Sequence, residues 1–499
     1  MTQNANDARL RVLFVSAEMV PFAKEGGLSD VAGALPKALA ELGCDIRTII
    51  PLYGSVARDK YEIEPVAGLP DIAIPMGERT ETAKLYQAKI PDSEVKAYLV
   101  ENKKYFDRDG VYNDPATGEG YPDTAERFIL FQKAVMGSLR ELEWQPRIVH
   151  CNDFHTGFIP YYLKRDNEGG AEAIASLFSI HNLAYQGVEE PEILPIADIP
   201  ADQFYPVSAF EYYGKVNMMK VGIVFADMIN TVSPTYAREI QSGPKFGFGL
   251  EGVLRSRASD VRGIVNGIDY SIWNPETDEL IPARYSAADL SGKTKNKREL
   301  LKRSKLPVSK GNVPLIGIIS RLVEQKGFDI LGEALENILE MDVQMVVLGT
   351  GKREYHDMFE KAAKQYSKQL AVELAFDNQL AHLIEAGSDI FLMPSRYEPC
   401  GLNQLYSLRY GTIPIVRATG GLADTIQEYN PATGQGTGFR FEEYSADALT
   451  AVVQRALKFF GDREAWSRLV QNAMAADFSW KTSAEQYIDL YHQAINNAS

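Results

Sequence analysis

The sequence has few cysteines, no apolar run long enough to span a membrane and no excess of basic residues. Its three cysteines, Cys44, Cys151 and Cys400, lie far apart and form no Cys-x-x-Cys pair of the kind typical of metal sites. Such sparse cysteine use favours a reducing compartment, and we expect a cytoplasmic protein. The first residues lack the basic start and apolar core of a signal peptide. No stretch approaches the roughly 20 apolar residues that span a bilayer, so no membrane segment is expected.

The chain carries more acidic than basic residues. Fifty-two Lys and Arg residues stand against 67 Asp and Glu residues, which gives a net charge of −15. A field of this sign repels nucleic acids and anionic lipid surfaces, so neither is an expected partner. A small molecule that carries phosphate can still bind to this negatively charged protein, but only where lysine, arginine or backbone N–H groups gather locally. The sequence leaves the oligomeric state open.

The order of apolar runs indicates an α/β fold. Of 499 residues, 45% are hydrophobic and 24% are charged, which is ordinary for a soluble globular protein, and the length favours two large domains. Short runs rich in β-branched residues alternate with stretches of helical length, as in buried parallel strands joined by helices. In the first half these runs are Val12–Val15, Ile46–Ile50, Ile148–His150, Leu177–Ile180, Ile229–Val232 and Val261–Val265.

A polar stretch over 274–310 interrupts this rhythm, which then restarts. The runs of the second half are Leu315–Ile319, Met345–Leu348, Ile390–Met393 and Ile413–Val416. The restart predicts a second α/β domain, although the two halves share no visible sequence repeat.

A pair of glycines follows the first predicted strand, in the segment Lys24-Glu25-Gly26-Gly27-Leu28. The apolar residues after it fit one helical face, so the pair lies at a helix N-terminus, and Pro36 indicates a kink or a later start. Unpaired N–H groups and the Lys24 ammonium could bind an anion there, and a plain turn is the alternative. The Gly-x-Gly-x-x-Gly fingerprint is absent, which disfavours a nicotinamide dehydrogenase.

Two polar segments follow neighbouring predicted strands. They are His150-Cys151-Asn152-Asp153-Phe154-His155-Thr156-Gly157 and His181-Asn182-Leu183-Ala184-Tyr185-Gln186-Gly187. Open α/β sheets bind ligands beyond the carboxyl ends of their strands, so the two segments are predicted to share one site. Two histidines and Asp153 could suggest a metal, but the spacing fits poorly because His150 belongs to the strand. For each histidine, a structural hydrogen-bonding role is the alternative.

Two basic residues and a glycine turn mark the second half. Arg321 follows the run Leu315–Ile319, and Lys326 opens the next helix. Both could converge on a diphosphate, arginine through its planar fork and lysine as a compact charge, whereas ordinary surface solvation is the alternative. The turn Gly349-Thr350-Gly351 suits a nucleotide that lies against the backbone.

Glu398 lies in the segment Ser395-Arg396-Tyr397-Glu398-Pro399-Cys400-Gly401-Leu402, ahead of a helix predicted from about Leu402 to Arg409. An acid at this position often only compensates the helix dipole. However, the second Gly-Gly-Leu segment, within Thr419–Asp424, adds further N–H donors near the same edge. Cys400 is interpreted as a packing residue, because no base can be assigned that would make it a nucleophile.

Together these segments resemble glycosyltransferase family five, the bacterial glycogen synthases and plant starch synthases, from about Val12 to Tyr491. Ten motifs in the family's order are far more specific than any one of them. They are Lys-x-Gly-Gly-Leu at 24–28, Asp-x-His at 153–155, His-Asn-Leu-Ala-Tyr-Gln-Gly at 181–187, Val-Ser-Pro-Thr-Tyr-Ala-Arg-Glu at 232–239, Gly-x-Gly-Leu-Glu-Gly at 247–252, Asn-Gly-Ile-Asp at 266–269, Ser-Arg-Leu at 320–322, Gln-Lys-Gly at 325–327, Pro-Ser-Arg-Tyr-Glu-Pro-Cys-Gly-Leu at 394–402 and Thr-Gly-Gly-Leu-Ala-Asp at 419–424.

The resemblance implies a GT-B fold, with two Rossmann-like, doubly wound domains facing across an interdomain cleft. The expected boundaries are 1–265 for the acceptor-side domain, 266–480 for the nucleotide-sugar domain, and 481–499 for a final helix that returns to the first domain. The implied reaction moves glucose from ADP-glucose to the non-reducing 4-OH of an α-1,4-glucan, as in glycogen and starch elongation, with retention of the α configuration. No metal or other cofactor is implied. The compartment is the cytoplasm, or the plastid stroma for a plant member without its transit peptide.

Carried over motif by motif, the resemblance implies catalytic roles for four residues. Arg321 and Lys326 would neutralise the departing diphosphate, Glu398 would bind the donor glucose, and His155 would contact the donor sugar. Nucleotide contacts are implied for Gly349, Gly351 and Tyr397. Substrate contacts are implied for Lys24, Gly26, Gly27, Asp30, Asp153, His181, Asn182, Asn266, Cys400, Gly401, Leu402, Thr419, Gly420 and Gly421.

Glu25 departs from the family, which commonly has threonine or valine between this lysine and the first glycine. Its carboxylate would either weaken anion binding at the loop or pair with Lys24.

Three other functions fit the sequence less well. They are a GT-B transferase that uses another nucleotide sugar or makes a small disaccharide, an inactive glucan-binding or regulatory protein, and a nicotinamide dehydrogenase. No residue that reads the nucleobase can be named, so the preference for ADP-glucose over UDP-glucose rests on the resemblance.

Overall fold

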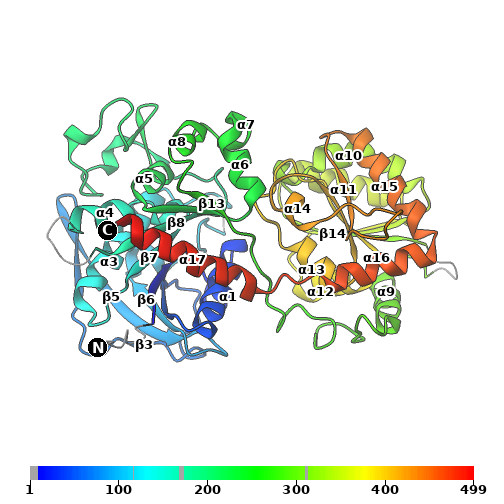
Figure 1. Ribbon diagram of the computed structural model, residues 1–499, viewed down its shortest axis with the longest axis horizontal. Helices are drawn as coiled ribbons and strands as arrows, with labels where there is room; N and C mark the ends of the chain where they lie inside the picture. The colour runs from blue at the N-terminus through cyan, green and yellow to red at the C-terminus, as the bar shows by residue number, and fades with distance from the viewer. Residues whose placement is uncertain (1–8, 116, 168–172, 309–312, 499) are drawn as a thin grey trace, which may run out of the picture. The chain divides into compact units, whose positions relative to one another are not determined.

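The computed structural model describes residues 9–115, 117–167, 173–308 and 313–498 (Figure 1). The chain forms two compact units. The first consists of residues 1–232, 237–267 and 480–499, and the second of residues 233–236 and 268–479. No helix in the described ranges is both long enough and apolar enough to cross a membrane.

The first unit is built on a ten-stranded sheet in the order β13-β12-β8-β7-β1-β2-β6-β5-β3, with β4 paired to β5. The parallel strands are β1 (Arg11–Val15), β2 (Asp45–Pro51), β6 (Lys96–Glu101), β7 (Ile148–Asn152), β8 (Ala175–Ile180), β12 (Met228–Thr231) and β13 (Val261–Gly263). The antiparallel edge consists of β3 (Glu64–Pro65), β4 (Ile72–Met76) and β5 (Arg79–Lys89). Buried apolar residues fill the central strands, as a sheet covered on both faces requires.

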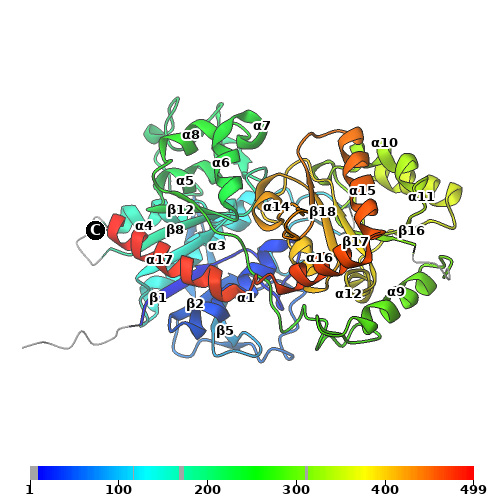
Figure 2. The ribbon, with the colours of Figure 1, turned by 45° about the vertical axis from the view of Figure 1, so that its right-hand side comes forward.

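Helices cover the two faces of this sheet because the strand order runs outward from β1 in both directions. A right-handed crossover from β1 to β2 and one from β7 to β8 place their helices, α1 (Gly27–Glu41) and α4 (Ile159–Asn167), on opposite faces. The C-terminal helix α17 (Trp480–Ala498) lies beside α1 (Figure 2), and α3 (Thr124–Glu141) packs against α4. A small sheet of β9 (Val188–Glu189), β10 (Glu211–Tyr212) and β11 (Lys215–Asn217) precedes α5 (Met218–Phe225).

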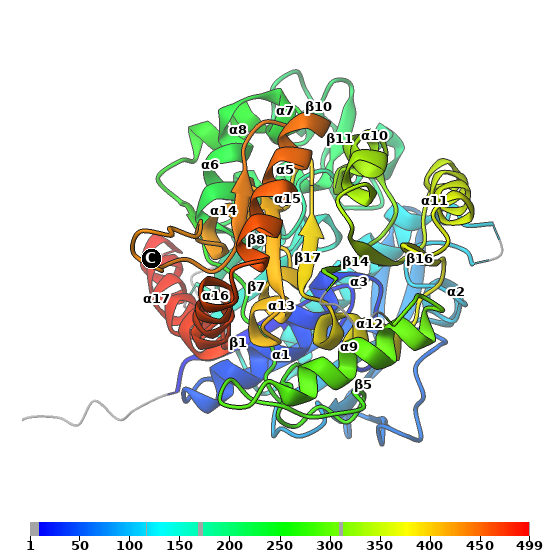
Figure 3. The same cartoon turned by 90° about the vertical axis from the view of Figure 1, so that its right-hand side faces the viewer.

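The second unit has a six-stranded parallel sheet in the order β16-β15-β14-β17-β18-β19. Its strands are β14 (Leu315–Ile319), β15 (Gln344–Leu348), β16 (Leu370–Glu373), β17 (Ile390–Met393), β18 (Ile413–Arg417) and β19 (Phe439–Phe441). The helices around it are α9 (Ser291–Arg303), α10 (Phe328–Leu339), α11 (Arg353–Gln365), α12 (Asn378–Gly387), α13 (Asn403–Arg409), α14 (Gly420–Thr425), α15 (Ala446–Phe460) and α16 (Arg463–Ala475). Helices α9 and α12 lie side by side, as do α10 and α15 (Figure 3).

All ten apolar runs that the sequence analysis assigned to strands are strands, with ends that shift by up to two residues. Two expectations need correction. Helix α1 begins at Gly27 and continues through Pro36, so the later start is wrong. The stretch over 274–310, interpreted only as polar, contains helix α9, in which Leu300 and Leu301 are buried and the half-buried Lys293 and Lys297 bond to Thr412 and Asp389.

The C-terminal helix α17 is fastened to the first unit by buried polar groups. The Nδ1 atom of His150 lies 2.9 Å from the hydroxyl of Tyr491, and its Nε2 atom lies 2.7 Å from Ser179 Oγ. Asn230 donates to the hydroxyl of Tyr487 at 2.8 Å. Burial lowers the pKa of His150 well below its usual value, so this histidine is neutral and structural.

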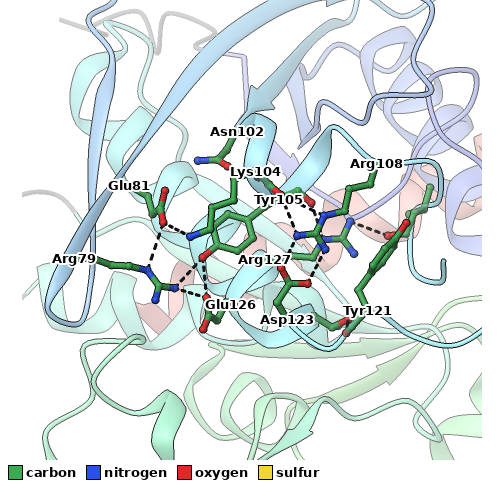
Figure 4. Close-up of polar contacts among 12 residues, drawn as sticks. Arg79, Glu81, Asn102, Lys104, Tyr105, Arg108, Tyr121, Asp123, Glu126 and Arg127 are labelled. Carbon is green, nitrogen blue, oxygen red and sulfur yellow. Dashed lines mark hydrogen bonds and ion pairs between the residues drawn. The ribbon is translucent and has the colours of Figure 1, made fainter.

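Arg127 on α3 is a fully buried cation that holds the segment before it (Figure 4). Its Nε atom donates to the carbonyl of Tyr105 at 2.8 Å and its Nη2 atom to the carbonyl of Val111 at 3.1 Å. The guanidinium also lies over the ring of Tyr121, 4.8 Å from its centroid. A backbone segment without regular structure is thereby fixed against the helix.

Replacement of Arg127 by methionine is expected to lower the free energy of unfolding by about 2–4 kcal/mol, because two buried carbonyls lose their donors. Arg108→Met is the matched control. Arg108 forms a two-fold hydrogen-bonded ion pair with Asp123, but both side chains reach solvent, so a loss of about 1 kcal/mol is expected. Urea unfolding followed by circular dichroism measures both, and equal losses would contradict this account.

Candidate active site

The strand order of each sheet reverses once, and the candidate residues follow the strands on either side of that reversal. In the first unit the reversal lies between β1 and β7, and in the second unit between β14 and β17. Loops diverge from a parallel sheet at such a point and leave room for a ligand beyond the carboxyl ends of the strands. Each unit therefore presents a candidate binding edge of its own.

The glycine loop after β1 is organised around a buried carboxylate, that of Glu18. Its Oε2 atom accepts the N–H of Glu25 at 2.6 Å and that of Gly26 at 2.9 Å. Burial raises the pKa of Glu18 above its usual value. Two of the N–H groups expected to face an external anion are thus engaged by the protein's own acid. Gly27, the second glycine of the loop, is the first residue of helix α1.

The exposed charges of the same loop are paired differently from the sequence expectation. The ammonium of Lys24 lies 2.8 Å from Asp30 Oδ1, so this lysine pairs with Asp30. The suggested pairing of Lys24 with Glu25 is wrong, and the Glu25 side chain lies exposed.

The two polar segments after β7 and β8 meet, as expected for neighbouring strands. Asp153 Oδ1 accepts the N–H of His181 at 2.7 Å and that of Asn182 at 3.5 Å. The Nε2 atom of His181 lies 2.9 Å from Asn152 Oδ1. Burial raises the pKa of Asp153 to about 7 and lowers that of His181 to about 4. Burial thus disfavours the charged form of both side chains.

His155 lies in a 3-10 turn (Phe154–Thr156) between aromatic rings. The ring of Tyr112 stacks on it at 4.9 Å and 22°, and the ring of Phe128 meets it edge-on at 4.5 Å. Within the described ranges, its buried Nδ1 atom has no hydrogen-bond partner. Burial, and to a lesser extent the charge of Arg127, lower the pKa of His155 to about 3, so the ring is neutral.

Glu18 and Tyr112 are site residues that the sequence analysis missed, and they hydrogen-bond to each other. Glu18 lies three residues after the end of β1. The expectation that ligand-binding residues follow the carboxyl ends of the strands, which pointed to Asp153, would therefore also have pointed to Glu18. Tyr112 lies in an irregular segment without any pattern.

Asn266, which the sequence analysis predicted to contact substrate, is buried. Among the described residues, its Oδ1 atom has no hydrogen-bond partner, and no hydrogen bond joins its side chain to Asp153 or His155.

In the second unit the loops after β14 and β17 are joined by an ion pair. Lys326 Nζ lies 2.6 Å from Glu398 Oε2, and the hydroxyl of Ser395 donates to the same oxygen at 3.0 Å. Glu398 is only 4% exposed, so the pair is shielded from water and strongly oriented. The Glu398 carboxylate therefore has one fixed position, with its Oε1 atom left for another partner.

The glycines of the second unit allow its loops to approach one another closely. A Cβ atom at Gly349 would lie 1.9 Å from the carbonyl oxygen of Ser320, and one at Gly420 would lie 1.9 Å from that of Glu398. The N–H of Gly421 donates to the carbonyls of Glu398 and Pro399. These glycines thus allow the loops after β14, β15, β17 and β18 to pack against one another at one edge of the sheet. This packing role is additional to any contact that the glycines make with a ligand.

The remaining predicted residues of this unit lie at the same edge. Cys400 is buried, Gly401 has the left-handed φ of +74°, and Leu402 precedes α13. The carbonyl of Tyr397 accepts a hydrogen bond from Gln325, and Gly351 packs against Leu322. The N-terminal residue of α14 is Gly420, with Thr419 as its cap.

Arg321 follows β14 and is exposed, and among the described residues its side chain has no hydrogen bond or ion pair. It is therefore an exposed cation that follows the strand beside the Lys326–Glu398 pair, but it is not part of that pair. In the described ranges no three His, Cys, Asp or Glu side chains gather in a way that could hold a metal ion.

Comparison with known proteins identifies the family. The family described as the starch synthase catalytic domain matches residues 11–256, and the one described as glycosyl transferases group 1 matches residues 301–473. A glycogen synthase from Koribacter versatilis is 45% identical over 97% of this chain and 98% of its own length. The chain belongs to the starch and glycogen synthase family. A family member from Thermotoga maritima, also a glycogen synthase, is 44% identical over 97% of this chain and 99% of its own.

Two solved structures agree with the fold. The catalytic domain of starch synthase IV from Arabidopsis thaliana, bound to ADP and acarbose, matches with a TM-score of 0.89 at 32% identity, over 98% of this chain and 100% of that one. A sucrose-phosphate synthase from Thermosynechococcus elongatus shares the fold alone, with a TM-score of 0.58 at 17% identity over 97% and 99% of the chains. This member of the family has the GT-B fold of two Rossmann-like α/β domains, which confirms the expected fold class.

Asp153→Asn is expected to flatten part of the pH dependence of stability. The pKa of Asp153 is about 7 in the folded chain and ~3.9 in an unfolded one. Between these values the folded state keeps a proton that the unfolded state has lost, so the free energy of unfolding falls as pH rises, by about 4 kcal/mol at most. Below pH ~4 the group contributes nothing, and above pH 7 the loss is complete.

Asparagine keeps the oxygen that accepts the His181 N–H, and it has nearly the size and shape of the aspartate that adopts the φ of +56° at this position. Urea unfolding at pH 5, 6.5 and 8 compares variant and parent chain. The stability difference should grow across this range in favour of the variant. Parallel pH profiles would show that Asp153 is ionised throughout.

Proposed function

We propose that this chain transfers glucose from ADP-glucose to the non-reducing 4-OH of an α-1,4-glucan and retains the α configuration. Membership of the starch and glycogen synthase family supports glucosyl transfer that elongates an α-glucan. The observation that carries the proposal is the buried Lys326–Glu398 pair at the switch point of the second sheet, where an acid and a cation are fixed side by side.

The second unit is suited to the nucleotide sugar. Lys326 supplies a positive charge and Arg321 an exposed guanidinium, which together can neutralise a departing diphosphate. Gly349 and Gly351 end the neighbouring strand with a backbone turn, and Phe376, which is 82% exposed, follows β16. Because β16 pairs with β15, this exposed ring follows the strand next to the one that ends in the glycine turn, and it offers a stacking surface for a nucleobase.

The chemistry needs charge stabilisation rather than a resident metal. The bond between glucose C1 and the diphosphate oxygen breaks, the bond from C1 to the acceptor oxygen forms, and the acceptor proton leaves with the diphosphate. Glu398 would hold donor hydroxyls through Oε1 while Lys326 and Ser395 fix its other oxygen. We infer that the neutral His155, with Asp153, His181 and Asn182 at the same edge of the first unit, contacts sugar hydroxyls. Cytoplasmic location is part of the same proposal.

Two alternatives to this proposal can be tested separately. A transferase for a different nucleotide sugar would have the same candidate residues at the sheet edge of the second unit. A glucan-binding protein without turnover would have the same candidate residues at the sheet edge of the first unit. The intact Lys326–Glu398 pair argues against the inactive form, because a buried ion pair without a ligand to bind usually gives little stability in return for its desolvation.

Glu398→Gln and Lys326→Met are each expected to lower kcat by on the order of a hundredfold or more, since each removes one charge-stabilising group. Lys302→Ala, at an exposed lysine of α9 in the same unit, is the control and should leave kcat within about twofold. Steady-state glucose incorporation into glycogen measures all three. Near-parent turnover in both site variants would refute the assigned roles.

Initial rates with ADP-glucose and UDP-glucose, measured side by side with glycogen as acceptor, test the donor. ADP-glucose should give the higher kcat/KM. A preference for UDP-glucose would leave the reaction class intact and correct the nucleotide. Glycogen binding without transfer from either donor would favour the inactive binding protein.

A further inference from the structure

The segment between β17 and α13, which carries Ser395 and Glu398, has no regular backbone structure of its own. The Glu398 carboxylate must nevertheless keep one position, because Lys326 and Ser395 hold one of its oxygens and the donor glucose is expected at the other. A displacement of about 1 Å at such a group can cost on the order of a hundredfold in rate. The contacts that fix this segment therefore determine where Glu398 lies.

A buried arginine that is not among the predicted site residues, Arg417, holds this segment. It is the last residue of β18, the strand that pairs with β17, and it is only 7% exposed. Its Nη1 atom donates to the carbonyl of Arg396 at 2.7 Å and, at 3.4 Å, to that of Ser395. Its Nε atom donates to the carbonyl of Glu442 at 3.2 Å. Because charged donors form strong hydrogen bonds, the peptide groups just before Glu398 are firmly held.

Arg396 in turn joins this segment to the loop that carries Lys326. Its N–H donates to the carbonyl of Gln325 at 2.8 Å. Its guanidinium lies 3.2 Å from Glu324 Oε1 and 2.7 Å from Asp329 Oδ2, and these two acids stand on either side of Lys326 in the sequence. The two loops that form the Lys326 ion pair are therefore connected through this one residue.

The ring of Tyr444 packs against both arginines. The guanidinium of Arg396 lies 4.8 Å from the ring centroid and that of Arg417 lies 5.4 Å from it. The tyrosine hydroxyl donates to Asp329 Oδ1 at 2.5 Å. Burial opposes the ionisation of Asp329, but hydrogen bonds from Tyr444, the Ile330 N–H and Arg396 outweigh it and keep the pKa of this acid below its usual value. The ionised carboxylate therefore balances the charge of Arg396.

We propose that Arg417 is a positioning residue for glucosyl transfer, which fixes the peptide between Ser395 and Arg396 and thereby the place of the Glu398 carboxylate. The inference rests on the proposed function, in which Glu398 holds the donor glucose. Arg417 acts through the segment and takes no part in the transfer itself. The alternative is a purely structural role, in which Arg417 only ties β18 to the segment over 442–444.

Arg417→Met keeps the apolar stem and removes the donors, so kcat should fall about tenfold as the Glu398 carboxylate loses its fixed position. Arg417→Lys retains a charged donor and should lose no more than about threefold. Arg409→Met is the matched control. Arg409 is a half-buried arginine at the end of α13 that donates to Asn274, and its replacement should leave kcat within about twofold. Steady-state glucose incorporation into glycogen measures all three, and circular dichroism checks that they fold.

A double-mutant cycle separates positioning from a general weakening of the fold. Once Glu398 is replaced by alanine, no carboxylate remains to be positioned, so adding Arg417→Met should change kcat by less than about twofold. A structural defect would instead lower kcat about tenfold in both backgrounds. That result, or a parent-like kcat in Arg417→Met alone, would overturn the inference.

Calorimetric binding needs no turnover and distinguishes this inference from the proposed function. In Arg417→Met the Kd for ADP-glucose should rise at least about threefold, whereas the Kd for ADP should stay within about twofold, because only the glucose reaches Glu398. A parent chain that transfers no glucose from any donor, but whose variant shows this difference, would reject the proposed function and support the role of Arg417. In such a chain, an unchanged Kd for ADP-glucose would reject both.

Discussion

Parallel strands all end on the same edge of their sheet, and the position of each candidate residue in this chain depends on that constraint. The loops after β1 and β7 in the first unit, and after β14 and β17 in the second, begin at adjacent strands that are followed by helices on opposite faces. Residues as distant in sequence as Lys326 and Glu398 are therefore 2.6 Å apart. The buried apolar strands that impose this geometry have no chemical role themselves, yet the placement of the site is inseparable from their packing.

The two edges differ in how they stabilise buried acids, and the difference matches two kinds of ligand. In the first unit, Glu18 and Asp153 are held by backbone N–H groups, their pKa values are raised, and His155 is neutral. Such an edge is rich in hydrogen-bonding groups but low in charge, which suits sugar hydroxyls. In the second unit a lysine holds Glu398, and an exposed arginine stands nearby in sequence, which suits an anion.

The sequence predicted the buried strands well because their apolar runs are continuous and separated by helical stretches. It missed the buried parallel strand β6 and the antiparallel β4 and β5, and exposed threonine and lysine residues interrupt the apolar residues of β5. It also missed the short β16 and β19. In the site, Asp153 and His181 were predicted to meet because they follow neighbouring strands. The stacking of Tyr112 on His155 was not predictable, since it depends on how Arg127 fixes an irregular segment. Nor could the sequence show that Gly26 and Gly421 donate their N–H groups within the protein.

Strain and support occur together on the surface of the first unit, and their combination is more informative than exposure alone. A lone exposed valine on a mobile turn would relax to a negative φ, because its conformation costs of order 1–3 kcal/mol. Here the ionised Glu211 and the buried Lys220 fix four backbone groups around Val207 and Tyr213, which prevents that relaxation. The carbonyl of Phe248, itself at a left-handed φ of +48°, then links this support to Gln186 of the loop after β8.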